Sequence, residues 1–125
     1  MADESVSGPV EVIDLIRMRA ADIVNIKLMK TGGLSNAIKL ADIAGLHGVE
    51  CMIGCMIETS ISVAAAAHLA VAKSDVITKV DLDGPSLCAW NPVEGGVSFE
   101  DAEISIGDAP GLGIVSIRGV QPIAG

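Results

Sequence analysis

A lysine stands where the sequence otherwise reads as a buried strand. Lys27 interrupts the β-branched, apolar run of residues 22–29. A lysine on the inner face or at the C-terminal tip of a buried parallel strand loses solvation, and this loss lowers its pKa toward a value that suits proton transfer. Alternatively, Lys27 only ends the strand and its ammonium group reaches outward into water. Lys30, in the following loop, is expected to be solvated.

Two aspartates form a second charged feature, in the segment Asp81-Leu82-Asp83. Alternate residues of a strand point to the same side, so both carboxylates would face one spot while Leu82 packs behind them. Two like charges held together need a cation, which can be a metal ion, a substrate ammonium group or a lysine. The alternative is a turn, because Asp83 is followed by Gly-Pro and this composition is typical of turns.

Two further acidic residues carry weaker signals. Asp3, next to Glu4, stands just before a predicted helix, where acidic residues commonly stabilise the helix N-terminus. Glu58 follows a predicted strand and is either an active-site loop residue or a charge at the N-terminus of the next helix. The second interpretation is favoured for Glu58.

The elements that position these residues follow from hydrophobic periodicity and from glycine and proline. Ser35 is expected to cap a helix, and the alanine-rich helix that ends near residue 72 must pack closely against another element. The predicted helices cover residues 9–19, 35–46 and 60–72, and the predicted strands cover residues 22–29, 49–53 and 76–80, with a glycine loop at 31–33.

Strands recur at intervals of about 25 to 30 residues, with a glycine loop and a helix between them, which is the rhythm of βαβ units in a parallel sheet. Either an open sheet or a segment of a barrel fits this rhythm. A complete (β/α)₈ barrel needs roughly 250 residues, so a chain of 125 residues holds less than half of one. In both arrangements functional groups gather at the C-terminal ends of strands, where Lys27 and the aspartate pair fall.

The end of the chain differs from this repeating layer. Alternating apolar residues, with glycine pairs and a Pro-Gly turn, predict short strands and turns without a helix in residues 95–125. The fold class is therefore α/β, with strands and helices over residues 1–94, as an open sheet or as a partial barrel, and a β-rich tail over residues 95–125.

Composition excludes several functional classes. Half of the residues are apolar, which favours a sizeable buried core, and the net charge of −8 opposes nucleic-acid binding. The start of the chain lacks the pattern of a secretory signal, and no apolar run reaches the roughly 18 residues of a membrane span, so a cytoplasmic protein that does not bind membranes is expected. Cys51, Cys55 and Cys88 give no recognised zinc spacing and are expected to be reduced, mainly structural thiols.

Four segments, taken together in their order and spacing, resemble a known family. They are residues 2–5 (ADES), 25–33 (NIKLMKTGG), 50–58 (ECMIGCMIE) and 81–85 (DLDGP). The chain resembles the dipeptide epimerases of the enolase superfamily, the L-Ala-D/L-Glu epimerase type, over nearly its whole length. The resemblance implies the C-terminal portion of a (β/α)₈ TIM barrel, about strands six to eight with their helices, followed by a tail that would pack toward a capping domain.

The resemblance also implies roles for residues of this chain. Lys27 would be the acid/base lysine of strand six, and Asp3 would be the last of three carboxylates that bind a divalent cation, Mg²⁺. Asp81 and Asp83 resemble the pair that grips the α-ammonium group of the dipeptide substrate, and Met56 is a candidate substrate contact. The implied chemistry is a 1,1-proton transfer through an enediolate, which makes the family's members isomerases.

This sequence also departs from the family pattern, because it holds no counterpart of strands one to four, of the Lys-x-Lys motif or of the first two metal carboxylates. The chain is therefore expected to be a C-terminal fragment that is inactive alone. Another superfamily member, of the muconate cycloisomerase or o-succinylbenzoate synthase type, is the first alternative, and the Asp-x-Asp pair argues against it. The second alternative is a non-catalytic α/β module that self-associates through its exposed sheet edges.

Overall fold

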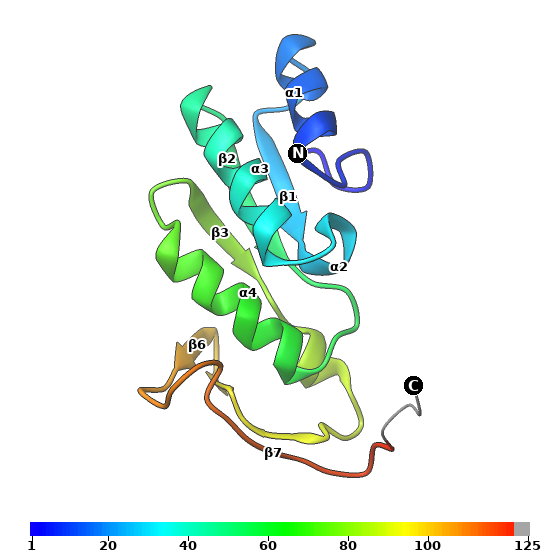
Figure 1. Cartoon of the computed structure of the whole chain (residues 1–125), viewed down its shortest axis with the longest axis vertical. Helices are drawn as coiled ribbons and strands as arrows, with labels where there is room; N and C mark the ends of the chain where they lie inside the picture. Colours follow the sequence, from blue (N-terminus) through cyan, green and yellow to red (C-terminus); the bar gives the residue numbers. More distant parts are fainter. Residues whose placement is uncertain (122–125) are drawn as a thin grey trace.

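Figure 1 shows the chain in a computed structural model that describes residues 1–121. Helices alternate with parallel strands up to β3, and short strands joined by turns follow. In chain order the elements are α1 (Pro9–Arg17), β1 (Ile23–Lys27), α2 (Leu28–Thr31), α3 (Leu34–Leu46), β2 (Glu50–Gly54), α4 (Ser60–Ala72), β3 (Ile77–Asp81), the 3₁₀ helix η1 (Gly84–Leu87), β4 (Val93–Gly95), β5 (Val97–Glu100), β6 (Glu103–Ile106) and β7 (Ile114–Ile117).

The central sheet has the strand order β1-β2-β3, and both pairings are parallel. The helices α3 and α4 make the two crossovers, and both lie on the same side of the sheet (Figure 1). Right-handed crossovers that step in one direction along a sheet place their helices on one face, whereas an open doubly wound sheet carries helices on both faces. The predicted α/β class is confirmed, and the arrangement is that of a barrel segment.

The core lies between the sheet and these two helices. Ile26 and Ile53 are paired in register and fully buried on the face that the helices cover. Small residues of the helices allow close packing, and a side chain at Gly45 would stand 2.6 Å from a methyl carbon of Val76. The alanine-rich helix packs closely, as expected, because every residue from Val63 to Ala67 is buried.

The end of the first strand differs from the prediction. β1 stops at Lys27, and residues 28–31 form the single helical turn α2 in place of two further strand residues and a loop. The hydroxyl of Thr31 bonds the carbonyl oxygens of Lys27 and Leu28, and this local bonding competes with strand pairing. The expected cap at Ser35 is also wrong, because α3 begins at Leu34 and its N-cap is Gly33.

The tail consists of antiparallel pairs, as the alternating apolar residues predicted. β5 pairs with β6, with Val97 opposite Ile106 and Phe99 opposite Ile104, and β4 pairs with β7. Partly buried tail residues, among them Val97 and Leu112, pack against the main core. The division at residue 94 falls within β4 and stays a prediction.

Among residues 1–121, no helix has both the length and the apolar composition that crossing a bilayer requires.

Burial distinguishes the three cysteines. Cys51 is fully buried in β2, and this burial raises the pKa of its thiol to about 11, whereas Cys55 and Cys88 are half-buried. The thiolate is the reactive form, so at pH 8 only about one Cys51 thiol in a thousand is ionised.

We therefore expect iodoacetamide at pH 8 to modify Cys55 and Cys88 in the folded chain and to leave Cys51 intact, as fragment-ion mass spectrometry would report. In guanidinium chloride all three thiols should react. Equal labelling of Cys51 in the folded chain would contradict its placement in the core.

Candidate functional site

The strand register places Lys27 and Asp81 in one row across the sheet. Lys27 is opposite Gly54 of β2, and Gly54 is opposite Asp81 of β3. Laterally paired residues of parallel strands direct their side chains to the same face, and two strand spacings separate Lys27 from Asp81 by roughly 10 Å. Both residues lie at the C-terminal ends of their strands, on the face opposite Ile26 and Ile53. Gly54, between them, has no side chain, and the amide group of Asn25 fills the space beside it.

Lys27 is held by carboxylates of the N-terminal segment. Its Nζ lies 3.0 Å from Oδ2 of Asp3 and 3.2 Å from Oε1 of Glu4. The hydrogen bond with Asp3 raises the Lys27 pKa; burial acts in the opposite direction, and the bond to Glu4 adds to the increase. The expected lowering of the Lys27 pKa is therefore wrong in this structure, because the neighbouring carboxylates outweigh desolvation.

Lys30 also differs from its expected place in solvent. Its Nζ donates to Oδ1 of Asp3 at 2.5 Å and to the backbone carbonyl oxygen of Asp3 at 2.6 Å, and its side chain is only 10% exposed. Asp3 thus lies between two ammonium groups. Burial raises the pKa of the Asp3 carboxyl, but the hydrogen bonds from Lys30, Lys27 and Asn25 together hold that pKa below its usual value.

The aspartate pair is arranged differently from a continuous strand. Asp81 ends β3, but Asp83 has helical dihedral angles (φ −84°, ψ −4°) and precedes η1. Its carbonyl oxygen accepts hydrogen bonds from the backbone and the hydroxyl of Ser86, as in a turn. Leu82 packs behind, at 2% exposure, and both carboxylates are exposed. At Asp83 the alternative interpretation, a turn, is therefore the one that agrees with the structure, and the alternation of two strand residues is wrong there.

The loop after β2 completes this end of the sheet. Met56 is 43% exposed, and its backbone oxygen lies against Gly84. The sequence indicated only a structural thiol at Cys55, whose Sγ accepts a hydrogen bond from the Gly84 amide and lies 4.0 Å from Oδ1 of Asp83. Burial raises the pKa of the Cys55 thiol, the Gly84 bond opposes this, and the nearby carboxylates add to the increase. A half-buried cysteine beside an aspartate is not visible in local patterning.

Glu58 lies just before α4 and is buried, with 6% exposure. Its Oε2 accepts a hydrogen bond from the hydroxyl of Ser62 in the first turn of the helix. The favoured interpretation, a charge at a helix N-terminus, agrees with this position. The other oxygen, Oε1, has no partner among the described residues.

A divalent cation would find one suited ligand in Asp3, because carboxylate oxygens are the ligands that Mg²⁺ prefers. Within residues 1–121, however, no group of three His, Cys, Asp or Glu side chains is arranged to hold a metal ion. The described residues therefore fit part of a metal site and do not form a complete one.

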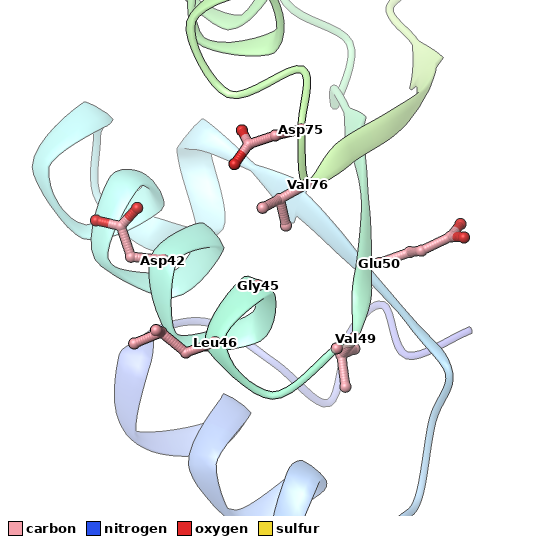
Figure 2. A pocket seen from close by; sticks show the side chains of 8 residues that line it. Asp42, Gly45, Leu46, Val49, Glu50, Asp75 and Val76 are labelled. Atoms are coloured by element: carbon pink, nitrogen blue, oxygen red, sulfur yellow. The ribbon is translucent and has the colours of Figure 1, made fainter.

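A pocket of about 720 Å³ lies at the other end of the sheet, where β2 and β3 begin (Figure 2). Asp42, Glu50 and Asp75 are among its lining residues, and the side chain of Glu50 extends away from the two aspartates (Figure 2). Asp42 is paired with Lys73 at 2.6 Å, and Glu50 is paired with Lys79. Asp42 and Glu50 are thus already paired with lysines. In barrels the N-terminal ends of the strands serve stability, so we place the candidate site at the C-terminal ends.

Comparison with known proteins gives a family. The family model described as "Enolase C-terminal domain-like" matches residues 1–118. The chain is 53% identical over 118 residues to the L-Ala-D/L-Glu epimerase of Clostridium acetobutylicum, covering 94% of this chain and 33% of that protein.

Two solved structures are also similar. The substrate-liganded L-Ala-D/L-Glu epimerase from Bacillus subtilis matches with a TM-score of 0.89 and 44% identity, covering 94% of this chain and 32% of that one. The dipeptide epimerase from Enterococcus faecalis V583 in complex with Mg and the dipeptide L-Leu-L-Tyr matches with a TM-score of 0.86 and 46% identity, covering 93% and 33%. The chain therefore spans about a third of the length of these relatives.

Gly54 lies between Lys27 and Asp81 in the row of site residues. A Cβ atom there would stand 2.7 Å from Oδ1 and 3.0 Å from Nδ2 of Asn25, whose side chain is buried beneath it. We expect Gly54→Ala to displace Asn25 and to lower the free energy of unfolding by about 1–3 kcal/mol, as overpacking does, measured by urea denaturation.

Gly107→Ala is the matched control, because nothing lies within 4 Å of a Cβ atom at Gly107. That variant should unfold at nearly the urea concentration of the unmodified chain. A Gly54→Ala variant as stable as this control would show that the space beside Gly54 is not filled by Asn25.

Proposed function

The chain belongs to the enolase C-terminal domain-like family, and from this premise we propose that it carries part of the active site of a metal-dependent dipeptide epimerase. The reaction is a 1,1-proton transfer at the carbon next to a carboxylate, which makes the enzyme an isomerase. One observation carries the proposal: Lys27 and Asp81 share a row and a face at the C-terminal ends of parallel strands, with Asp3 beside Lys27.

Lys27 is proposed to move the proton at the reacting carbon. Its Nζ lies 3.0 Å from Oδ2 of Asp3, and its side chain is only 13% exposed, so the amine is largely shielded from water. Inversion of a stereocentre needs a second acid/base group on the opposite face of the substrate. Lys27 supplies one of the two faces.

Asp3 is proposed to be one ligand of the divalent cation, with Mg²⁺ as the metal. Enolase-superfamily sites combine a Lys or His base with one or two Mg²⁺ ions that stabilise the enediolate. The Enterococcus faecalis relative binds Mg, which supports this metal. Asp3 alone gives a single carboxylate, so the remaining ligands have to come from outside the described residues.

Asp81 and Asp83 are proposed to bind the α-ammonium group of the substrate by charge-assisted hydrogen bonds. Their carboxylates are exposed, and the turn at Asp83 fixes the second one relative to the strand end. The exposed side chain of Met56 is a candidate contact from the adjacent loop. An ammonium-binding pair favours an amino-acid-derived substrate, a dipeptide, over the substrates of muconate cycloisomerases and o-succinylbenzoate synthases.

The purified chain should show no epimerase activity with Mg²⁺ and L-Ala-L-Glu, because one carboxylate and one acid/base lysine do not complete the site. Exchange of the α-proton of the glutamate residue in D₂O, followed by ¹H NMR, measures this. Turnover by the chain alone would contradict the proposal that it needs further ligands.

The positive test uses a chimera in which this chain replaces the matching third of the Bacillus subtilis epimerase. The chimera should exchange the α-proton of L-Ala-L-Glu, and Lys27→Met in the chimera should lower kcat by about 10³-fold, within the range of a lost acid/base group. Asp83→Asn should mainly raise KM.

Lys39→Met, at an exposed position of α3, is the control and should leave the rate unchanged. A folded chimera that exchanges the proton equally well with and without the Lys27 amine would exclude Lys27 as the acid/base group.

A further inference from the structure

Two lysines contact the same carboxylate, and their contacts differ in kind. Lys30 bonds both Oδ1 and the backbone carbonyl oxygen of Asp3, at 2.5 and 2.6 Å. Lys27 forms an ion pair with Oδ2 at 3.0 Å and a second ion pair with the exposed Glu4 at 3.2 Å. We propose that Lys30 is a positioning residue that fixes the orientation of the Asp3 carboxylate. Its bond to Oδ1 leaves Oδ2 as the oxygen that can bind either Lys27 or a divalent cation.

The two bonds of Lys30 restrict Asp3 at two points. The backbone bond fixes where the N-terminal segment lies, and the side-chain bond selects one orientation of the carboxylate. An ammonium group has three donors and can satisfy both acceptors at once. With its side chain 10% exposed, Lys30 is also largely shielded from water that would compete for these bonds.

The short helix α2 holds Lys30 in this position. The hydroxyl of Thr31 bonds the carbonyl oxygens of Lys27, Leu28 and Gly33, and the side-chain amide of Asn36 bonds the carbonyl of Thr31. Gly32 ends the turn in the left-handed conformation, with a φ of 74°. The turn therefore presents Lys30 from a locally fixed backbone.

Lys27 lacks this second attachment to Asp3. Its other partner, Glu4, has a side chain that is 68% exposed. Ion pairs exposed to water are weak, so this one does little to fix the position of either side chain. Loss of Lys27 should thus leave the Asp3 carboxylate where it is, because Lys30 still holds Oδ1 and the backbone. Loss of Lys30 should release it, because the remaining contacts, from Lys27 and Asn25, are to the carboxylate alone and do not hold the Asp3 backbone.

The inference rests on the proposed function, in which Asp3 is a metal ligand. If Lys30 occupies Oδ1 permanently, a divalent cation competes with Lys27 for Oδ2 and not with Lys30. The two lysines then have separate roles: Lys30 positions the Asp3 carboxylate, and Lys27 gives up its place at Oδ2 to the divalent cation.

The test measures the χ1 rotamer of Asp3 in the 125-residue chain, from the three-bond N–Cγ and C′–Cγ couplings. In the unmodified chain and in Lys27→Met, one rotamer should hold above about 90% of the population. In Lys30→Met the couplings should average over two or three rotamers, with the main one falling to about half. Lys39→Met controls for the loss of a positive charge.

Three results would overturn the proposal: a single Asp3 rotamer in folded Lys30→Met, equal averaging in Lys27→Met, or averaging in Lys39→Met. Lys30→Gln is the second variant if Lys30→Met does not fold. If both Lys30 variants lose cooperative unfolding and Lys27→Met keeps it, Lys30 is a structural cation and the positioning role is also overturned. The measurement uses neither metal nor substrate, so an inactive chimera would sink the proposed function without touching this result.

Discussion

One carboxylate between two ammonium groups ties the start of the chain to the end of the first strand. Besides the Asp3 contacts, the N-terminal segment meets the sheet through the β-bridge between Ala2 and Val24 and through the ion pair of Glu4 with Lys27. Lys27 contacts Oδ2 of Asp3 and Lys30 contacts Oδ1, so each of these largely buried ammonium groups has a partner of opposite charge. Loss of Asp3 would therefore remove a contact between the segment and the strand tip and leave both lysines without this partner.

The parallel register carries the second constraint. Shifting a strand by one residue turns every side chain to the other face, so the burial of Ile26 and Ile53 against the helices fixes Lys27 and Asp81 on the opposite face. Gly54 between them has no side chain, and Asn25 uses the space beneath. Apolar packing on one face thus decides where the chemistry on the other face can occur.

The two ends of the sheet have different characters. At the N-terminal ends of β2 and β3, the acidic groups Asp42 and Glu50 already have lysine partners, and the pocket beside them is lined mainly by small and apolar residues. At the C-terminal ends, the carboxylates of Asp81 and Asp83 are exposed and lie near Cys55. The pocket at the N-terminal ends therefore does not mark the candidate active site. That site is recognised from its charged side chains and from its position at the C-terminal ends of the strands.

Local periodicity determined the order of helices and strands, the α/β class, the close packing of the alanine-rich helix and the position of Lys27 at a strand tip, because these depend on residues near one another in the chain. The family resemblance over the same residues is confirmed by the match to residues 1–118. For the aspartate pair, the local Gly-Pro composition had left the turn open as one of two interpretations. Only the tertiary structure decided that Lys30 is paired and that the Lys27 pKa rises. The physical reason is distance along the chain: the partner of Lys30 is 27 residues away, and the energy of a charge depends on its spatial neighbours, which no local pattern encodes.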